Sequence, residues 1–352
     1  MLIEKISLRN VRNFSNYLCE FSPGINLVYG KNGKGKTTIL EAIYSMSMGK
    51  SFKNGPRKNL IKFEEDSFLI NGRVKTETGK TLQISVACSG DRYKISVDKK
   101  VVISIMDLID VFPVVVMAPE NIELIDGTGV IRRNFFDRLI SIVDKQYMSV
   151  LKEYNRILRQ RKILLWEKNE AMIQLWSEKM ADSGLVLWDK RKQSFHQFSE
   201  LFANLWPSEL NHFIGETKYL PKSANTKEEF LYQLQKVKKQ ELIRKANLYG
   251  PHKDDFLFLI NRVSARYFAS QGEKKLFLTV LKNTECKFIQ HYLRKPPILL
   301  LDDLLAKLDN DRGLNIMEML RSNNQAIITS TDQAVIEILN QSQVKINTIQ
   351  LV

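Results

Sequence analysis

The chain of 352 residues is poor in the residue types that build metal centres and disulfide frameworks. It holds three cysteines, Cys19, Cys88 and Cys286, and no two of them have the spacing of a metal or redox motif. We therefore expect reduced packing residues of the kind found inside cells. The four histidines also lack ligand spacing, and the motif around His252 makes it the one functional candidate among His196, His212, His252 and His291.

Long apolar runs and long heptad repeats are missing as well. No apolar segment approaches the roughly 20 residues that a membrane-spanning helix needs. The first residues, Met1 to Glu4, predict a strand and not a signal peptide. The helical patterns are short, interrupted and without a sustained a/d repeat. We therefore expect a cytoplasmic protein with no membrane partner and no long coiled coil.

Acidic residues are outnumbered by basic ones. The sequence has 53 Lys and Arg against 39 Asp and Glu, a formal net charge of +14 and a pI of about 9.5. Such a balance favours a polyanionic partner such as nucleic acid. The length exceeds that of one typical domain, so a second lobe is expected.

One glycine-rich segment matches the phosphate-binding pattern G-x-x-x-x-G-K-[ST] without a mismatch. An apolar strand pattern precedes it and a helical pattern follows it, which is the context that this loop requires. Its backbone N–H groups and the helix N-terminus would hold the phosphates, Lys36 would reach the β- and γ-phosphates, and the Thr37 hydroxyl would bind Mg²⁺. The predicted ATP contacts are Gly30, Lys31, Asn32, Gly33, Lys34, Gly35, Lys36, Thr37 and Thr38.

A second motif supplies carboxylates. Residues 298–301 are Ile-Leu-Leu-Leu, and Asp302 and Asp303 follow directly. An unbroken apolar run that ends in acids predicts a central parallel strand whose carboxyl end meets the ligand. Asp302 would hold Mg²⁺ through water, and Asp303 would orient or deprotonate the attacking water.

The order of the motifs resembles that of the ATP-binding-cassette ATPases. The phosphate loop is followed by Ser270, Gln271 and Gly272 at the start of an amphipathic helix, then by the acidic strand and by Asp309. The resemblance implies that Ser270, Gln271 and Gly272 contact the ATP of a second subunit, and that Asp309 belongs to the same nucleotide site. ATP would then hold a homodimer together.

Within this superfamily the sequence resembles the RecF family of bacterial recombination mediators over nearly its whole length. The segments that carry the resemblance are residues 3–14, 41–52, 118–121, 132–137 and 250–255, the last reading Gly-Pro-His-Lys-Asp-Asp. The resemblance implies a weak ATPase that uses hydrolysis as a switch in DNA repair, DNA replication and the SOS response. It also implies RecR and RecO as partners and duplex DNA near single-strand gaps or junctions as the ligand, with a preference for single strands left open.

The pattern of elements predicts an α/β fold. Alternating segments at 68–74, 82–86 and 93–97 indicate antiparallel strands, helical periodicity extends from about 131 to 244, and strand patterns return at Phe256. We predict an ABC-type ATPase lobe with a mixed sheet and an antiparallel subdomain, formed by residues 1–115 and 246–352. A helical lobe, residues 116–245, would be inserted into it.

The DNA-binding surface is predicted on the helical lobe. Lys152, Arg156 and Arg159 recur at helical spacing, Lys190, Arg191 and Lys192 form a second basic run, and Lys236, Lys238 and Lys239 form a third. A solvated helix face is the simpler interpretation of any one group alone. Together they indicate phosphate contacts without base reading.

A defence ATPase of the overcoming-lysogenisation type is the alternative function. Its similar ATPase head is joined to a nuclease, and a metal-dependent nuclease needs a further acidic cluster. Beyond Asp332 the sequence offers only Glu337 and a final strand pattern. We therefore favour the ATP-gated DNA clamp.

Overall fold

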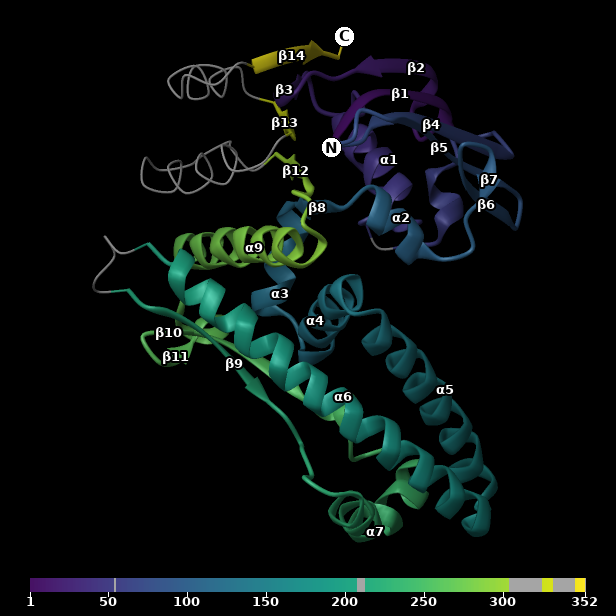
Figure 1. Ribbon diagram of the computed structural model, residues 1–352, viewed down its shortest axis with the longest axis vertical. Coiled ribbons are helices and arrows are strands. Elements are labelled where there is room, and N and C mark those ends of the chain that lie inside the picture. Colours follow the sequence, from purple (N-terminus) through teal and green to yellow (C-terminus); the bar gives the residue numbers. More distant parts are fainter. Residues whose placement is uncertain (54, 208–212, 304–324, 332–345, 352) are drawn as a thin grey trace. The chain divides into compact units, whose positions relative to one another are not determined.

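The computed structural model describes residues 1–53, 55–207, 213–303, 325–331 and 346–351 (Figure 1). Contacts between Cα atoms divide the chain into two compact units. The first consists of Met1–Asn121 together with Glu285–Val352, and the second is Ile122–Thr284.

A parallel sheet forms the centre of the first unit. Its five strands are arranged in the order β14-β3-β13-β12-β8, and all four neighbouring pairs are parallel. The strands are β3 (Gly24–Tyr29), β8 (Val114–Met117), β12 (Ile298–Asp302), β13 (Gln325–Ser330) and β14 (Ile346–Gln350). Every residue of β8, β12 and β13 is buried. Such uniform burial explains why these strands read as continuous apolar runs.

A second, antiparallel sheet has the order β2-β1-β4-β5-β6-β7. Its strands are β1 (Leu2–Val11), β2 (Phe14–Glu20), β4 (Ser67–Lys75), β5 (Thr81–Ser89), β6 (Arg92–Val97) and β7 (Lys100–Val101). Buried residues alternate with more exposed ones along β4 and β5, so one face of the sheet packs on the core. The predicted strands at 68–74, 82–86 and 93–97 are confirmed.

Helix α1 (Lys36–Met48) packs against strands of both sheets. All but one of its thirteen residues are buried, which accounts for the dense apolar sequence after the phosphate loop. The Gln325 side chain also joins the sheets, because it exchanges two hydrogen bonds of 2.8 Å with the backbone of Ile3. The remaining short elements of this unit are η1 (Arg57–Leu60), α2 (Ile105–Val111) and η2 (Pro119–Ile122).

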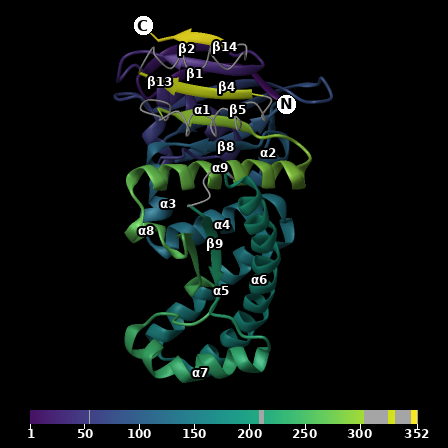
Figure 2. The ribbon, with the colours of Figure 1, turned by 90° about the vertical axis from the view of Figure 1, so that its left-hand side faces the viewer.

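The second unit is mainly helical. Its helices are α3 (Glu123–Asp126), α4 (Gly129–Val143), α5 (Lys145–Glu167), α6 (Glu170–Leu205), α7 (Lys227–Arg244), η3 (Pro251–Lys253), α8 (Ala265–Phe268) and most of α9 (Gln271–Leu293). Helices α5 and α6 run beside each other, and α7 lies near the end of the unit where α5 ends and α6 begins (Figures 1 and 2). Tyr147 and Tyr154 of α5 are buried against α6 residues such as Trp188. The helical periodicity predicted for this segment is thereby confirmed.

The helical unit also contains a small antiparallel sheet, in which the strand predicted at Phe256 is confirmed and the strand at 215–220 corrects the helical prediction for that segment. Its order is β11-β10-β9, from β9 (Gly215–Leu220), β10 (Asp255–Ile260) and β11 (Val263–Ser264). Because β10 pairs with β9 along its whole length, residues after 245 belong to this compact unit. The division falls between Thr284 and Glu285, inside α9, whereas the sequence placed it at 245–246. The first division lies at 121–122, compared with the predicted 115–116.

Candidate nucleotide site

The phosphate loop lies between β3 and α1 at the carboxyl end of the parallel sheet. Gly33 and Gly35 have positive φ angles of 81° and 97°, in the left-handed region that favours glycine. A Cβ atom on Gly35 would also lie 2.5 Å from the ring of Phe14. A side chain at this position would clash with the turn between β1 and β2. The loop can therefore bring backbone N–H groups close to a ligand only with glycine here.

Lys36 is the first residue of α1 and folds back over the loop. Its Nζ atom donates hydrogen bonds to the carbonyl oxygens of Gly30 (2.8 Å) and Lys31 (3.1 Å). The side chain is almost fully buried, while Lys31 to Lys34 are exposed. A cation held over an open loop at a helix N-terminus is placed to bind a phosphate.

Thr37 and Asp302 meet at the end of the sheet, although 265 positions separate them in the sequence. The Thr37 hydroxyl lies 2.9 Å and 3.0 Å from the two carboxylate oxygens of Asp302. Asp302 is the last residue of β12 and is buried. The loop and the acidic strand thus place the two predicted Mg²⁺ ligands side by side.

Thr329 on β13 positions both acidic residues. It is the parallel partner of Asp302, and its hydroxyl donates to Asp302 Oδ1 at 2.7 Å. The same hydroxyl accepts a hydrogen bond of 3.0 Å from the backbone N–H of Asp303. Asp303 has a φ of 49°, so the chain turns sharply there, and its side chain is exposed. The two neighbouring carboxylates therefore differ in their surroundings: Asp302 is buried and Asp303 is exposed to solvent.

The donor set suits Mg²⁺. Hydroxyl and carboxylate oxygens are its preferred protein ligands, and it usually keeps one or two of them together with water and substrate phosphates. Among the described residues, no group of three or more His, Cys, Asp or Glu side chains could hold a metal ion by itself. Thr37 and Asp302 therefore fit an ion that is shared with a nucleotide.

Burial raises the pKa of Asp302, and hydrogen bonds from Thr329 and Thr37 partly oppose this rise. Lys53 lowers the pKa of Asp302 and Glu120 raises it through their charges, so both side chains lie near this carboxylate. Lys53 and Glu120 were missed by the sequence analysis. Glu120 follows β8, the parallel neighbour of β12, and its position after a buried strand was the available signal.

The turn between β1 and β2 supplies further side chains. Asn13 Nδ2 donates to the carbonyl oxygen of Gly33 in the phosphate loop (3.1 Å). Arg12 Nη2 pairs with the buried carboxylate of Glu41 on α1 (3.0 Å), and Ser51 donates to the same oxygen (2.6 Å). This turn belongs to the segment 3–14 that carries the family resemblance, and no role in the site was predicted for it. Long-range contacts of this kind have no local sequence signal.

The predicted signature residues Ser270, Gln271 and Gly272 lie in the second unit, where α9 begins. The Ser270 backbone N–H donates to Glu273 Oε2 (2.6 Å), and the Glu273 N–H donates to Ser270 Oγ (3.3 Å). This reciprocal pair caps the helix. Ser270 and Gln271 are exposed, as are Tyr267 and Phe268 just before them, at 71% and 73%. Asp309 lies outside the described residues.

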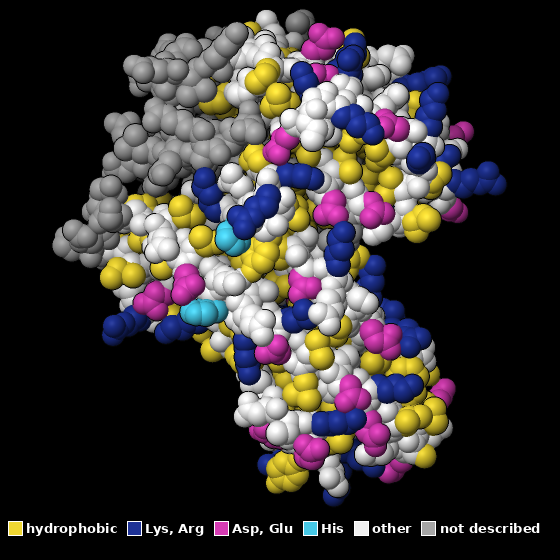
Figure 3. Space-filling view, in the orientation of Figure 1, with side chains coloured by type: hydrophobic (Ala, Val, Ile, Leu, Met, Phe, Trp, Pro, Cys, Tyr) yellow, Lys and Arg dark blue, Asp and Glu magenta, His cyan; other side chains and the backbone are white. Residues whose placement is uncertain are grey.

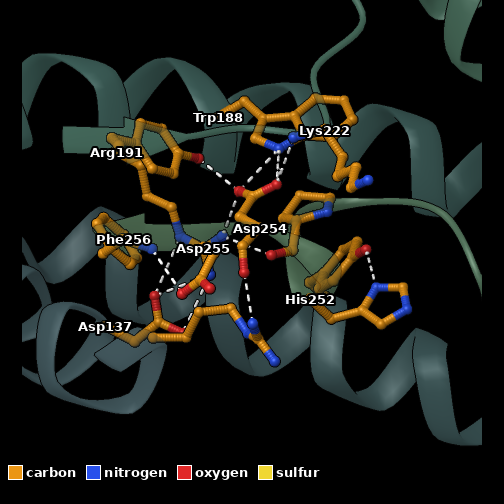
Figure 4. A network of polar contacts seen from close by, with 12 residues as sticks. Asp137, Trp188, Arg191, Lys222, His252, Asp254, Asp255 and Phe256 are labelled. Atoms are coloured by element: carbon orange, nitrogen blue, oxygen red, sulfur yellow. Dashed lines mark hydrogen bonds and ion pairs between the residues drawn. The ribbon is translucent and has the colours of Figure 1, made fainter. Parts of the chain in front are cut away.

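The segment Gly250–Asp255 is the centre of a buried polar network in the second unit (Figure 4). Asp254 is fully buried and accepts hydrogen bonds from Trp188 Nε1, Tyr219 Oη, the Lys222 N–H and Arg191. Arg191 also forms a bidentate pair with Asp137. Asp255 forms a second bidentate pair, with Arg132. This segment holds helices α4 and α6 to β10, and its buried charges are paired as burial requires.

His252 belongs to the same network and is a packing residue. Its Nδ1 accepts from the Tyr154 hydroxyl (2.9 Å), and its Nε2 donates to the Asn247 carbonyl oxygen (3.1 Å). Burial lowers the pKa of His252 to about 4, so the ring is neutral near pH 7. The structure thus accounts for both ring nitrogens of the one functional histidine candidate.

Lys152, Arg156 and Arg159 are exposed on α5, where the sequence placed them. Of the second basic run, Lys192 is exposed, whereas Arg191 and Lys190 are engaged in ion pairs. Arg191 is buried and ion-paired with Asp137 and Asp254, and Lys190 is paired with Asp144 at 2.7 Å. Helical periodicity places these cations on α6 but cannot show which of them are buried in ion pairs.

Comparison with known proteins supports one family. A profile of the "RecF/RecN/SMC N terminal domain" matches residues 2–350. "DNA replication and repair protein RecF" of Streptococcus agalactiae is 33% identical over 342 residues, with 94% of this chain and 92% of that protein covered. The protein of the same name from Geotalea daltonii is 32% identical over 340 residues and covers 94% and 93%.

Solved structures agree. A structure described as the recombination mediator protein RecF with ATP, in the RecFOR pathway, has a TM-score of 0.86 and 29% identity, and covers 94% of this chain and 92% of that one. The Smc head domain of Pyrococcus furiosus has a TM-score of 0.55 at 16% identity and shares the fold alone.

Fold and site together define a P-loop ATPase of the ABC type with the SMC-head architecture and, in the part of the chain that the structure describes, no long coiled coil. The chain belongs to the RecF family. No helix among the described residues is both long and apolar enough to cross a bilayer.

Proposed function

We propose that this protein is an ATP-dependent DNA-binding protein of recombinational repair and replication restart. The observation that carries the proposal is the convergence of Thr37, Asp302 and Thr329 beside a glycine-rich phosphate loop. Relatives over more than nine tenths of the chain are named for DNA replication and repair, and a solved relative is described with ATP. ATP with Mg²⁺ is therefore the proposed ligand.

ATP binding drives formation of a homodimer in this proposal. Ser270, Gln271 and Gly272 would contact the nucleotide on a second copy. The position of the exposed Ser270 and Gln271 at a helix N-terminus supports this role, because the partial positive charge of a helix N-terminus attracts phosphate. Tyr267 and Phe268, adjacent in sequence and exposed, suit an interface that is covered when the second copy binds.

Hydrolysis serves as a release switch. Asp303 is the proposed residue that orients or deprotonates the attacking water, because it follows the Mg²⁺ ligand directly and its side chain is open to solvent. Asp302 is buried among Thr37 and Thr329 and suits the ion instead. If hydrolysis is slow, the ATP-bound dimer stays on DNA for longer than a single diffusional encounter would last.

The DNA partner contacts the protein mainly through phosphates. The net charge of +14 and the exposed Lys152, Arg156 and Arg159 support this part of the proposal. Duplex DNA near a single-strand gap or junction is the proposed ligand, in a cytoplasmic setting. RecR and RecO are the proposed protein partners, because the solved relatives are described within the RecFOR pathway.

Sedimentation of the whole chain tests the proposal. With ATP and Mg²⁺ the protein should sediment as a dimer, and DNA affinity should increase with ATP. Log affinity should fall with log salt, by about 0.9 for each contacted phosphate. Replacement of Lys152, Arg156 and Arg159 by Glu should weaken DNA binding and spare ATP binding. DNA affinity that depends on neither ATP nor salt would contradict the proposal.

A further inference from the structure

The exposed face of α5 carries more than the three cations that the sequence predicted. Lys152, Arg156, Arg159, Ile163 and Trp166 recur at steps of four, three, four and three residues, which keeps them on one side of a helix. We call this row the α5 stripe. All five residues are exposed, with Ile163 at 50% and Trp166 at 59%. The stripe spans about 21 Å at 1.5 Å per residue.

The opposite side of α5 shows that the stripe faces away from the unit's interior. Tyr147, Tyr154, Ile157, Arg161 and Leu165 are buried on that side. Arg161 is held there by Glu241 (2.6 Å) and Asn247 (2.7 Å). Because the helix is already anchored by this buried face, Trp166 is not needed to attach it.

Trp166 lies at the carboxyl end of the stripe within a basic surrounding. The Lys245 ammonium, from the end of α7, lies 3.6 Å from the centre of its ring. Lys162 and Lys168 of the same segment are exposed. Two acids belong to this region: Glu153, which pairs with Arg156 at 2.9 Å, and the exposed Glu167. The cations outnumber them. Figure 3 shows dark blue and yellow side chains interspersed with magenta ones on the α5 side of this unit.

We propose that the α5 stripe binds single-stranded DNA, with phosphates along Lys152, Arg156 and Arg159 and an unpaired base stacked on Trp166. Nonspecific single-strand sites combine a cationic track with aromatic rings on which bases stack, and every base offers such a face. A duplex has no free base for Trp166, whereas the single-stranded side of a gap has many. The inference rests on the proposed DNA-binding function and adds the reason why a gap is preferred over intact duplex.

Charge and shape favour DNA over a protein as the occupant. An acidic peptide would also be attracted by the cations, but it does not offer a flat ring at every unit for Trp166 to stack on, as a nucleic-acid strand does. The stripe is the convex outer side of a helix. A nucleic-acid strand requires only the cationic track and an accessible ring face.

The test uses the full chain with ATP and three DNA probes: oligothymidylate of about 15 nucleotides, blunt duplex of the same length, and duplex with a gap. Trp166→Ala should lower affinity for oligothymidylate and for gapped DNA by about 5- to 160-fold, the range for loss of one stacked base. Affinity for blunt duplex should stay the same. Trp166→Phe should lose less, because it keeps a ring.

Fluorescence gives a second readout with a matched control. Trp176 on α6 is partly buried and has a Lys179 ammonium 5.0 Å from its ring, so it is a similar pair away from the stripe. Oligothymidylate should quench the tryptophan emission of the wild type and of Trp176→Phe, and the quench should be lost in Trp166→Phe. Thermal unfolding should change little in Trp166→Ala, since the side chain is mostly exposed.

The outcomes separate the inference from the function on which it rests. Absence of DNA binding by the wild type with ATP would remove the proposed function itself. ATP-dependent duplex binding with unchanged single-strand affinity in Trp166→Ala would leave that function and overturn the stacking role. An equal loss of affinity for blunt duplex in Trp166→Ala would also overturn the stacking role. A quench of Trp166 by an acidic peptide with a terminal aromatic residue, and not by oligothymidylate, would assign the stripe to a protein partner.

Discussion

The Thr329 hydroxyl donates a 2.7 Å hydrogen bond to Asp302 Oδ1 across two neighbouring parallel strands. The same oxygen of Asp302 lies 2.9 Å from the Thr37 hydroxyl of the phosphate loop. Asp302 is thus held between Thr37 and Thr329, which are 292 positions apart in the sequence. A buried carboxylate held by two hydroxyl groups is ready to exchange one of them for a cation.

Thr329→Val removes this hydroxyl at nearly constant volume. Asp302 Oδ1 then loses a donor, and the pKa of Asp302 should rise further because burial is less compensated. We expect weaker Mg²⁺-dependent ATP binding, by roughly the 1 to 3 kcal/mol that a buried unsatisfied group costs. Titration calorimetry with and without Mg²⁺ measures the Mg²⁺-dependent affinity for ATP. Thr329→Ser keeps the hydroxyl and should behave as the wild type. An unaltered Mg²⁺ dependence in Thr329→Val would argue against Asp302 as the ligand.

Lys36→Met should abolish measurable ATP binding. Lys36 supplies the side-chain charge expected at the β- and γ-phosphates, and charged hydrogen bonds contribute about 1.5 to 3 kcal/mol each. Lys36→Arg should bind ATP but hydrolyse it poorly, because a guanidinium has a different donor geometry. Equilibrium binding of a fluorescent ATP analogue checks both. Unchanged affinity in Lys36→Met would show that another loop holds the nucleotide.

Asp302 and Asp303 should separate binding from turnover. Asp303→Asn removes the proposed water-orienting carboxylate from an exposed position, so it should retain ATP and accumulate as a dimer. Asp302→Asn should lose Mg²⁺-dependent affinity, since a neutral amide is a poorer ligand for a divalent cation. Light scattering at saturating ATP gives the mass of each. A monomeric Asp303→Asn under these conditions would mean that the roles are assigned wrongly.

Ser270→Arg tests contact across the dimer. ATP affinity of the monomer should be nearly unchanged, whereas dimerisation should fail because a long cation occupies the helix N-terminus. Mixing Ser270→Arg with Lys36→Met can restore one complete site between two different subunits. ATPase activity of the mixture should exceed that of either variant alone. An inactive mixture would speak against action between subunits.

The stability of the helical unit should depend on pH through His252. The pKa of His252 is lowered by burial to about 4, below its ordinary 6.5. Between these values the unfolded chain takes up a proton that the folded chain does not, so the free energy of unfolding falls as pH decreases through this window. The resulting destabilisation of the folded state is nearly absent above pH 6.5 and reaches roughly 3 kcal/mol near pH 4.

Urea unfolding at pH 7 and pH 5 measures this effect. All four tryptophans, Trp166, Trp176, Trp188 and Trp206, lie in the second unit, so their emission reports on that unit. His252→Gln should show a smaller pH dependence than the wild type. His196→Gln is the matched control, because His196 is 74% exposed. Equal pH dependence in all three proteins would exclude His252 as the source.

The local features of this protein could be predicted from neighbouring residues in the chain. Gly33, Gly35 and Lys36 follow a fixed spacing because one loop must wrap one phosphate group, and the apolar run before Asp302 reflects a strand buried on both faces. The antiparallel strands were predictable from alternation, since one side of that sheet packs on the core. These are short-range patterns, written in neighbouring residues.

The tertiary structure alone decided which distant residues meet. Thr329 donates a hydrogen bond to Asp302, and Asn13 donates one to Gly33. Arg191 is ion-paired with Asp137 and Asp254. Nothing in the local sequence distinguishes these side chains from solvated ones. Strand β9 was missed for a similar reason, because a short edge strand is fixed by pairing with β10 and not by its own composition. Hydrogen bonds and ion pairs form wherever the packed elements bring partners together. Which partners meet depends on the order of strands in a sheet and not on distance along the chain.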